Sequence, residues 1–446
     1  MSSAVRRSYT VALLAAAVFL WVVGCGGQPS APGGSNLPVG GGAGPASIAA
    51  QTPPFVPGQI LVKFADSVPA SARDAAIARL GAQKLDEIGG IHTLVLNVPS
   101  GQELAKVSEF SKLAGVQYAE PDYTLQAVAA FTPNDQYFGD QWGFQNSGLT
   151  PACTGSVAGT ASDDIDATDA WAGGWGGSSS VRIAMLDTGL QFNHPDFAPY
   201  ANQNSRVLLS KSFVGGNASD GNGHGTHTAG IASADTNNGI GVAGTAWQSS
   251  LIIGKVLNNN GSGSVSSSAN GITWAADNGA NVISMSYGYS ASSESSTEAS
   301  AISYAWGKGV VLVAAAGNSS SSSPNFWPAG NSNVVSVAAT DNNDTLASFS
   351  NFGSWVDVAA PGVCIASTYK GSSYVYLSGT SMATPYVSGV AALVWAQTGL
   401  ARVSPNNQTV VTQIESTANP LGKAGVDWKY GRVNACKAVV GTCSHN

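Results

Sequence analysis

The stretch Val181-Arg-Ile-Ala-Met-Leu-Asp-Thr-Gly189 joins an apolar run of strand composition to an aspartate and a glycine turn. The run is short and nearly continuous, which is typical of a strand buried on both faces of a sheet. Alternation of such runs with helical patterns predicts an α/β fold, a mostly parallel sheet with helices on both faces. The further runs lie at 251–256, 280–284 and 310–314, and the helical patterns between them include 224–232 and 265–277.

Asp187, at the end of the first run, belongs to one of three motifs that carry chemistry. In open α/β sheets, catalytic and ligand-binding groups gather at the carboxyl ends of the strands. The second motif is Asn222-Gly-His224-Gly-Thr-His227, where small residues clear space around a histidine at the expected start of a helix. The third motif is Ser378-Gly-Thr-Ser381-Met-Ala-Thr-Pro385, which places a serine at the N-terminus of an apolar helix.

Asp187, His224 and Ser381 are the residue types that nucleophilic attack on a peptide carbonyl requires. A serine hydroxyl needs a base to take its proton, and the base needs a carboxylate that fixes its tautomer. The chain order Asp, His, Ser differs from the orders of chymotrypsin and of the α/β-hydrolases. The hydrolase motif G-x-S-x-G would also require glycine at Ala383.

The same reaction needs hydrogen-bond donors for the oxyanion that develops in the transition state. Asn318 follows Gly317 just after the apolar run 310–314, so its side-chain amide is a suitable donor. The backbone N–H of Ser381 is a natural second donor, because it lies at a helix N-terminus whose dipole favours negative charge.

The motifs D-T-G, H-G-T-H-T-A-G, A-A-G-N and G-T-S-M-A-T-P occur in this order, and together they make the chain from 132 to 446 resemble the subtilisin-family serine proteases. The resemblance implies a serine endopeptidase that works through an acyl-enzyme. It implies that Asp187 orients His224, which acts as general base and then as general acid. It also implies that Ser381 is the nucleophile and that Asn318 is an oxyanion donor.

The resemblance further places the substrate as an added β-strand between two segments of this chain, an arrangement in which backbone pairing supplies affinity. The small walls of the primary pocket predict room for large apolar or aromatic side chains before the cut. Phe326 falls near the pocket floor in the family pattern, and it makes the pocket shallower if it points inward. The implied substrate residues are Gly261, Ser262 and Gly263 in the first segment, Ser286, Tyr287 and Gly288 in the second, and Ala315, Ala316 and Gly317 in the facing wall.

A structural calcium ion is another implication of the resemblance, because Asp196 and the loop 235–242 resemble the strong calcium site of subtilisins. Side-chain and backbone oxygens of this kind suit a hard cation. The alternative is a solvated turn without a metal. The expected ligands are Asp135, Asp196, Thr236, Asn238, Ile240 and Val242. Zinc between His224 and His227 is disfavoured because the motif H-E-x-x-H is lacking.

Residues 55–127 have the pattern of a second, smaller domain. Strand-like and helical segments follow one another in the order β-α-β-β-α-β of a split βαβ domain, if a short strand lies near 83–88. The segments P-G-Q-I-L-V-K-F and G-V-Q-Y-A-E-P-D-Y resemble the first and last strands of subtilase pro-domains. That resemblance implies a self-cleaving precursor, whose pro-domain inhibits the protease and serves as a template for its folding.

Residues 1–25 read as a signal peptide, with two arginines before an apolar run. The sequence Val22-Val23-Gly24-Cys25 resembles a bacterial lipobox, which implies that Cys25 carries a lipid anchor at the cell envelope. The alternative is an ordinary extracellular protein in which this cysteine is incidental. Residues 26–54 are rich in Gly, Pro and Ser and cannot bury enough apolar surface to fold, so we expect a flexible linker.

The cysteines other than Cys25 indicate disulfides. Four of the five cysteines remain when Cys25 is set aside. An even number in an exported chain is typical of disulfides, and four cysteines can pair in three ways. The local pairing of Cys436 with Cys443 is favoured, which leaves Cys153 with Cys364.

Composition disfavours a nucleic-acid partner, because the net charge is −7 and no basic cluster occurs. The expected partners are peptide or protein substrates, the chain's own pro-domain and a membrane reached through a lipid anchor, and a monomer is expected. A non-enzymatic protein on a degenerate scaffold would be expected to lack one of the catalytic residues, yet all are present. An esterase is a third class, against which the extended Gly/Ser segments argue.

Overall fold

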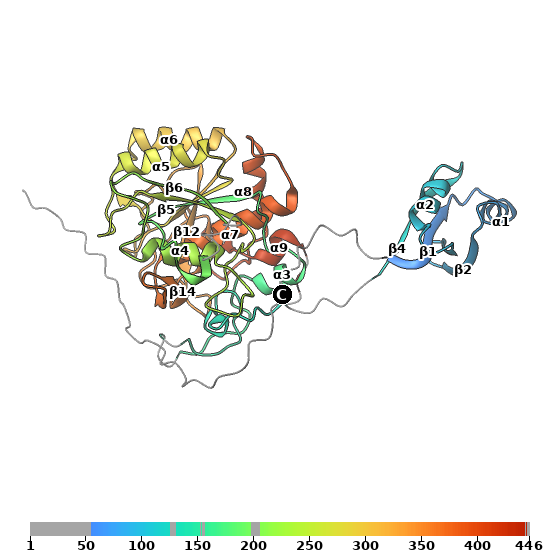
Figure 1. Ribbon diagram of the computed structural model, residues 1–446, viewed down its shortest axis with the longest axis horizontal. Coiled ribbons are helices and arrows are strands. Elements are labelled where there is room, and N and C mark those ends of the chain that lie inside the picture. The colour runs from blue at the N-terminus through green and yellow to red at the C-terminus, as the bar shows by residue number, and fades with distance from the viewer. Residues whose placement is uncertain are drawn as a thin grey trace, which may run out of the picture. The chain divides into compact units, whose positions relative to one another are not determined.

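The computed structural model describes residues 55–124, 131–151, 153, 157–197, 206–441 and 443. The chain divides into two units, a smaller one at Ala31–Val128 and a larger one that contains Ala129–Asn446 (Figure 1). Cys25, the expected linker 26–54 and the end of the expected pro-domain at 125–127 lie outside the described residues. Each unit is described by itself.

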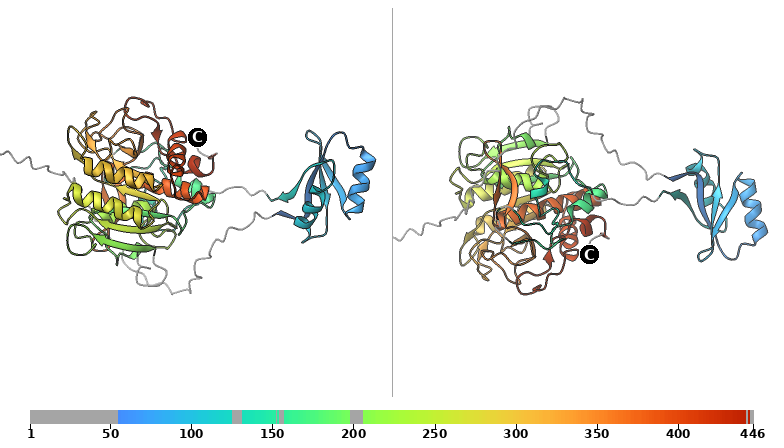
Figure 2. Two further views of the ribbon diagram at one scale, coloured as in Figure 1. Left: turned by 90° about the horizontal axis from the view of Figure 1, so that it is seen from above. Right: turned by 90° about the horizontal axis from the view of Figure 1, so that it is seen from below.

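The smaller unit is an antiparallel sheet with two helices, drawn in blue in Figure 2. The strand order is β2-β3-β1-β4. Alternate residues of the central strands, such as Ile60, Val62 and Leu96, are fully buried, so one face of the sheet makes the core. The elements are β1 (Phe55–Phe64), α1 (Ala70–Arg79), β2 (Gln83–Ile88), β3 (Thr93–Asn97), α2 (Glu103–Ser111) and β4 (Val116–Tyr123).

The larger unit is built on an eight-stranded sheet of order β16-β13-β12-β10-β8-β5-β7-β6, in which all neighbouring strands run parallel. This architecture confirms the predicted fold class. The strands are β5 (Arg182–Asp187), β6 (Val207–Ser212), β7 (Ser250–Lys255), β8 (Val282–Met285), β10 (Val311–Ala315), β12 (Val334–Thr340), β13 (Val358–Pro361) and β16 (Gly431–Arg432). The helices are α3 (Ala167–Ala172), α4 (His224–Ser233), α5 (Val265–Asp277), α6 (Ser296–Gly307), α7 (Thr380–Thr398), α8 (Asn406–Ser416) and α9 (Ala435–Val439), with a 3-10 turn at Phe138–Asp140.

Successive residues of the central strands enter two different cores, as expected for a sheet covered on both faces. Ala184 and Leu186 pack with α5 and α6, whereas Ile183 and Met185 pack with α7 and its neighbours. Figure 1 shows α5 and α6 together on one side of the sheet and α4 and α7 on the other. The apolar runs are therefore continuous because both of their faces are buried.

Helix α7 lies inside the larger unit and is buried from Thr380 to Trp395, apart from a partly exposed Ser381. Pro385 is accommodated near its start, where the first-turn N–H groups have no helical acceptors. The helix ends at Thr398, and the φ of 61° at the next residue, Gly399, is the left-handed conformation that favours glycine at a C-terminal cap. No helix in the described ranges is long and apolar enough to cross a membrane.

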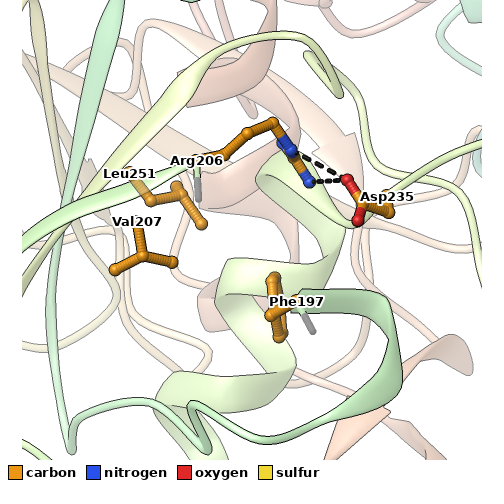
Figure 3. A pocket seen from close by; sticks show the side chains of 5 residues that line it. All are labelled: Phe197, Arg206, Val207, Asp235 and Leu251. Carbon is orange, nitrogen blue, oxygen red and sulfur yellow. Dashed lines mark hydrogen bonds and ion pairs between the residues drawn. The ribbon is translucent and has the colours of Figure 1, made fainter. Parts of the chain in front are cut away.

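The C-terminal end of α4 is held by Arg206 (Figure 3). The guanidinium donates from Nη2 to the carbonyl of Ser233 at 3.0 Å and from Nε to Asp235 Oδ1 at 2.8 Å. A cation at this end of a helix interacts favourably with the helix dipole. Phe197, Val207 and Leu251 are the apolar residues that line the small cavity beside this ion pair.

Two disulfides join distant and local parts of the larger unit. The structure pairs Cys153 with Cys364, at a sequence separation of 211, and Cys436 with Cys443, at a separation of 7. This is the favoured pairing among the three that the sequence left open. Cys364 directly precedes a hairpin, β14 (Ile365–Tyr369) and β15 (Ser373–Leu377), whose first strand contacts α4.

Candidate active site

Asp187 and His224 meet at the carboxyl edge of the sheet. Asp187 is the last residue of β5, and His224 is the first residue of α4, after Gly223 has turned the chain with a φ of 108°. The His224 Nδ1 atom lies 2.7 Å from Asp187 Oδ1. The buried carboxylate also accepts hydrogen bonds from the backbone N–H of Thr188 and the hydroxyl of Thr228. With Nδ1 donating to Asp187, Nε2 is left free to accept a proton.

The pKa of His224 reflects two opposing effects. Burial lowers it, but the charge and hydrogen bond of Asp187, together with the charge of Asp220, outweigh burial and raise the pKa above its ordinary value. The imidazolium is thus stabilised by two carboxylates. A histidine that gains a proton during a reaction needs this kind of support.

Asp220 is a functional residue that the sequence analysis did not single out. It is buried, and its carboxylate accepts hydrogen bonds from the backbone N–H groups of Gly223 at 2.8 Å and Thr226 at 2.9 Å. These groups lie at the start of α4, where N–H groups lack helical acceptors and the dipole favours negative charge. An aspartate four residues before a helix-starting histidine is the signal that could have revealed it.

Lys255 is a second residue that was missed. It is the last residue of β7, and the parallel register places it directly beside Asp187. Its buried ammonium donates to the carbonyl of Thr188 and to Asn259 Oδ1. Burial lowers its pKa, while the charges of Asp220 and Asp187 act in the opposite direction. The cation therefore lies within the electrostatic reach of both carboxylates around His224.

Ser381 is the second residue of α7, and it is tied to the chain just after β8. Its hydroxyl donates to the carbonyl of Ser286 at 3.1 Å, and the hydroxyl of Ser286 donates back to the carbonyl of Ser381 at 2.9 Å. This reciprocal pair joins the start of α7 to the second expected substrate segment. The serine is thus held at the same edge of the sheet as the other motifs.

The side-chain amide of Asn318 has a defined orientation. Its Oδ1 accepts hydrogen bonds from both the backbone N–H and the hydroxyl of Thr380, at 2.9 and 2.8 Å. The same hydroxyl accepts from the N–H of Gly317 at 3.1 Å. Because Oδ1 is occupied, the donor Nδ2 is directed away from Thr380, and it lies close to Gly379 in the turn that leads to Ser381. Thr380, another residue missed in the sequence, orients this donor.

The expected primary pocket is narrower than its glycine walls suggest. The ring of Phe326 lies between Gly288 and Gly317, since a Cβ atom on either glycine would come within 2.3 or 3.0 Å of it. Phe326 belongs to β11 (Phe326–Trp327), which pairs with β9 (Tyr289–Ser290) directly after the second substrate segment. The ring thus lies where the sequence analysis expected it to make the pocket shallower.

The facing wall expected at 315–317 lies at the end of β10 and directly after it. Ala315 and Ala316 are buried, and the backbone groups of Ala316 are engaged by β12 and by the side chain of Asn351. A Cβ atom on Gly317, the third residue expected in this wall, would also come within 2.5 Å of the amide of Asn351. By contrast, Ser262 and Gly263 in the first expected segment are exposed, in a turn where Gly261 has a φ of 77°.

Some of the expected calcium ligands come together. Asp196 is buried, and it accepts hydrogen bonds from the N–H of Val242 at 3.0 Å and from the amide of Asn238 at 3.4 Å. Burial raises its pKa to about 7, and the charge of the nearby Asp135 acts in the same direction. The Oδ1 atom of Asp135 is buried without a hydrogen-bond partner in the described part of the chain.

The other expected calcium ligands are Thr236, Ile240 and Val242, in the loop that follows α4. The Thr236 hydroxyl is occupied, since it donates to the carbonyl of Ala234 and accepts from the N–H of Gly244. Ile240 is 41% exposed, and Val242 turns its N–H, which cannot ligate a cation, toward Asp196. In the residues that the structure covers, no three His, Cys, Asp or Glu side chains gather around one point.

Family models match both units of the chain. The model of the Subtilase family matches residues 178–432. The model of the Fervidolysin N-terminal prodomain matches residues 43–122.

Similar proteins extend over most of the chain. A thermophilic serine proteinase from Bacillus sp. (strain AK1) is 39% identical over 86% of this chain and 88% of its own length. Thermitase from Thermoactinomyces vulgaris is 46% identical over 69% of this chain and 99% of its own length. A solved structure of a protease from Pseudoalteromonas arctica has a TM-score of 0.58 and 31% identity, and the match covers 70% of this chain and 99% of that one. The chain therefore belongs to the Subtilase family of serine endopeptidases, with an N-terminal pro-domain similar to that of fervidolysin.

Proposed function

We propose that this chain is the precursor of an exported endopeptidase in which Asp187, His224 and Ser381 form the catalytic triad. The observation that carries the proposal is the 2.7 Å contact between His224 Nδ1 and Asp187 Oδ1, which leaves Nε2 as the base. The proposal requires the Ser381 hydroxyl, which donates to the carbonyl of Ser286 in the structure, to turn toward that base. Catalytic hydrogen bonds commonly form only once substrate is bound.

The chemical steps follow from these positions. His224 Nε2 takes the proton of Ser381 as Oγ attacks the carbonyl carbon of the substrate, and the carbonyl oxygen becomes an oxyanion. Asn318 Nδ2 and the N–H of Ser381 donate hydrogen bonds to that oxygen. The imidazolium then protonates the leaving amine, and an acyl-enzyme remains. Water deprotonated by His224 attacks the ester, and Ser381 recovers its proton.

Replacing the nucleophile tests this assignment. Ser381→Ala is expected to lower kcat by several orders of magnitude and to leave a small residue of activity from the oxyanion donors. Ser322→Ala, on an exposed loop, is the control and should keep full activity. A Ser381→Ala enzyme with more than a few per cent of wild-type activity would contradict the proposed triad.

The pro-domain at 55–127 is proposed to be removed by the protease at 132–446 itself and then to inhibit it. The support is the match of each unit to its own family model, since a linked pro-domain and protease suit intramolecular cleavage. In a host without other proteases, Ser381→Ala should accumulate as the uncut precursor. A shortened product in that host would refute self-cleavage. Isolated pro-domain that fails to inhibit mature enzyme at micromolar concentration would refute inhibition.

We propose that substrate lies as an extended strand between segments 260–264 and 286–288. Exposed Gly263 offers backbone pairing groups that tolerate many sequences, whereas the N–H and the carbonyl of Ser262 are already bonded to Asn258. Affinity should then grow with the number of peptide units on the acyl side of the cut. A kcat/KM that does not change with peptide length would contradict this mode of binding.

The residue before the cut is proposed to be apolar and of small or medium size, because Phe326 occupies space between Gly288 and Gly317. The sequence analysis expected large apolar or aromatic side chains at this substrate position, and the proposal replaces them with smaller apolar ones. Phe326→Gly should raise kcat/KM for a substrate with Phe before the cut relative to one with Ala. An unchanged ratio would show that the ring does not limit the pocket.

A structural calcium ion is proposed at Asp135 and Asp196. The two side chains are buried and close enough for the charge of one to act on the other, and one Asp135 oxygen has no hydrogen-bond partner among the described residues. Two such carboxylates repel each other unless a cation lies between them, and carboxylate oxygens are the ligands that calcium prefers. Asn238 is the third side chain near enough to contribute. The occupied hydroxyl of Thr236 argues against that residue as a side-chain ligand.

Export with a lipid anchor at Cys25 is proposed from the lipobox resemblance and lies outside the described residues. Metabolic labelling with a radioactive fatty acid should mark the wild-type protein but not Cys25→Ser. Label on both proteins would place the lipid elsewhere, and label on neither would favour plain secretion.

A further inference from the structure

A buried carboxyl group lies behind the expected substrate cleft. Glu298, in the first turn of α6, is 1% exposed. Its Oε1 accepts a hydrogen bond from the hydroxyl of Ser268 at 2.6 Å, and its buried Oε2 has no partner at hydrogen-bond distance among the described residues, although the phenol of Tyr289 is close enough to lower the pKa of this carboxyl group. No ion pair of the described residues includes it. Burying a carboxyl group without a cation costs free energy, which the hydrogen bond from Ser268 offsets in part.

The hydrogen bonds continue from Ser268 to the cleft. The Ser268 oxygen lies 2.9 Å from the phenol oxygen of Tyr287. Because the serine proton is donated to Glu298, the serine oxygen accepts the proton of Tyr287. The chain of donors therefore runs in one direction, from Tyr287 through Ser268 to the carboxyl group, which is its final acceptor.

The two hydroxyl groups belong to the two sides of the proposed substrate site. Tyr287 is the middle residue of segment 286–288. Ser268 lies one turn into α5, and the N-cap of α5 is Ser264, the last residue of segment 260–264. A capping box between Ser264 and Ser267 joins that segment rigidly to the helix. The side chains thus tie one segment to the other.

The start of α6 adds a second tie. The phenol of Tyr289 accepts a hydrogen bond from the N–H of Ser295, the N-cap of α6, at 3.0 Å. Glu298 is one turn further along the same helix. The backbone from Tyr287 to Tyr289 is therefore held from α6 at two points, and the tie through Glu298 is the one that also reaches α5.

We propose that Glu298 is a positioning residue for substrate binding, which holds segments 260–264 and 286–288 at the separation that an extended peptide requires. A strand that pairs with an edge on each side lies about 4.8 Å from both, so the two edges must keep a fixed distance. This inference rests on the proposed function, because it assumes that the peptide lies between these segments. It predicts an effect on binding of long substrates rather than on the chemical step.

The test compares two substrates with the same residue before the cut, a single-residue anilide and a peptide anilide of about six residues, on processed enzyme. Wild-type kcat/KM should rise with length. Glu298→Leu, which removes the acceptor, is expected to raise KM for the long substrate about tenfold while kcat and the short substrate are unaffected. Glu298→Gln retains an acceptor oxygen and should restore the wild-type KM.

Two further variants complete the experiment. Tyr287→Phe should raise KM for the long substrate, and combining it with Glu298→Leu should add little, because both break the same chain of hydrogen bonds. Tyr287→Phe decides the outcome alone if Glu298→Leu does not fold. Glu294→Gln is the matched control, since this neighbouring carboxylate binds Asn331 instead and its loss should leave both KM values unchanged.

Each result has a definite reading. An unchanged KM for the long substrate in Glu298→Leu and in Tyr287→Phe would overturn the inference, as would additive effects of the two substitutions. Equal losses on both substrates, after active-site titration, would show a purely structural residue and would also overturn it. Wild-type activity that is independent of peptide length would instead refute the proposed substrate segments, so the two failures can be told apart.

Discussion

Acid should destabilise the larger unit through His227, which is fully buried. Its Nε2 lies 3.1 Å from the carbonyl of Ile365 and 3.2 Å from that of Val375, so Nε2 carries the proton and donates it. The Nδ1 atom is buried without a partner among the described residues. A second proton on Nδ1 would have no acceptor, and His227 must therefore stay neutral in the folded chain.

The magnitude follows from the pKa. Burial lowers the pKa of His227 to about 3, from an ordinary value of 6.5 in the unfolded chain. The unfolded state thus binds more protons below pH 6.5, so this contribution to stability is present above that pH and is lost as the pH falls toward 3. Between pH 7 and pH 5 the loss is about 2 kcal/mol for this one site.

The assay is urea unfolding of the Ser381→Ala protein at several pH values, followed by tryptophan fluorescence. No tryptophan occurs between 55 and 127, so the signal reports on the larger unit. His227→Gln keeps a donor for the carbonyls but cannot titrate, and its free energy of unfolding should fall by about 2 kcal/mol less than that of wild type between pH 7 and pH 5. His92→Gln, at an exposed histidine of the smaller unit, is the control. Equal pH dependence in wild type and His227→Gln would refute the reasoning.

Three other outcomes are expected. Thr380→Val should lower kcat about tenfold with little change in KM, because Asn318 loses a hydrogen bond that orients its amide. Steady-state kinetics that show a rise in KM instead would indicate that Thr380 binds substrate. Excess chelator should lower the Tm of wild type but not of Asp135→Asn, since a cation that binds only the folded state stabilises that state. Equal Tm values of the wild type with and without chelator would contradict the proposed calcium site. Removing the disulfide between Cys153 and Cys364 should lower the free energy of unfolding by about 5 kcal/mol, against about 2.5 kcal/mol for the disulfide between Cys436 and Cys443, because the first disulfide closes the longer loop. Denaturation that ranks the two losses in the opposite order would contradict this estimate.

Much of the fold could be predicted because its signals are local. The apolar run 181–186 is continuous since both faces of its strand are buried, and this pattern survives in the sequence alone. Helix α7 was expected to start near Ser381, and the structure starts it at Thr380. In the smaller unit, the short strand near 83–88 was expected, and β2 occupies those residues.

The chemistry of the candidate site was also visible in the sequence, whereas its support was not. Asp187, His224 and Ser381 lie in short motifs because each needs a particular turn or helix start around it. The Asp220 carboxylate has a local signal in its spacing from His224, but the hydrogen bond that it accepts from Thr188, 32 residues away along the chain, could not be recognised in the sequence. The pairing of Lys255 with Asp187 likewise depends on the register of two parallel strands.

By itself, then, the sequence determined the α/β class, the order of the catalytic motifs and the presence of a separate N-terminal domain, all of which rest on neighbouring residues and their periodicity. Only the tertiary structure decided that the ring of Phe326 lies between Gly288 and Gly317 and that Thr380 donates a hydrogen bond to the side-chain amide of Asn318. It alone brought Glu298 to Ser268, which is 30 residues away along the chain. Such contacts arise where separate helices and strands pack together. The secondary-structure propensity of a segment does not predict which side chains will come into contact there.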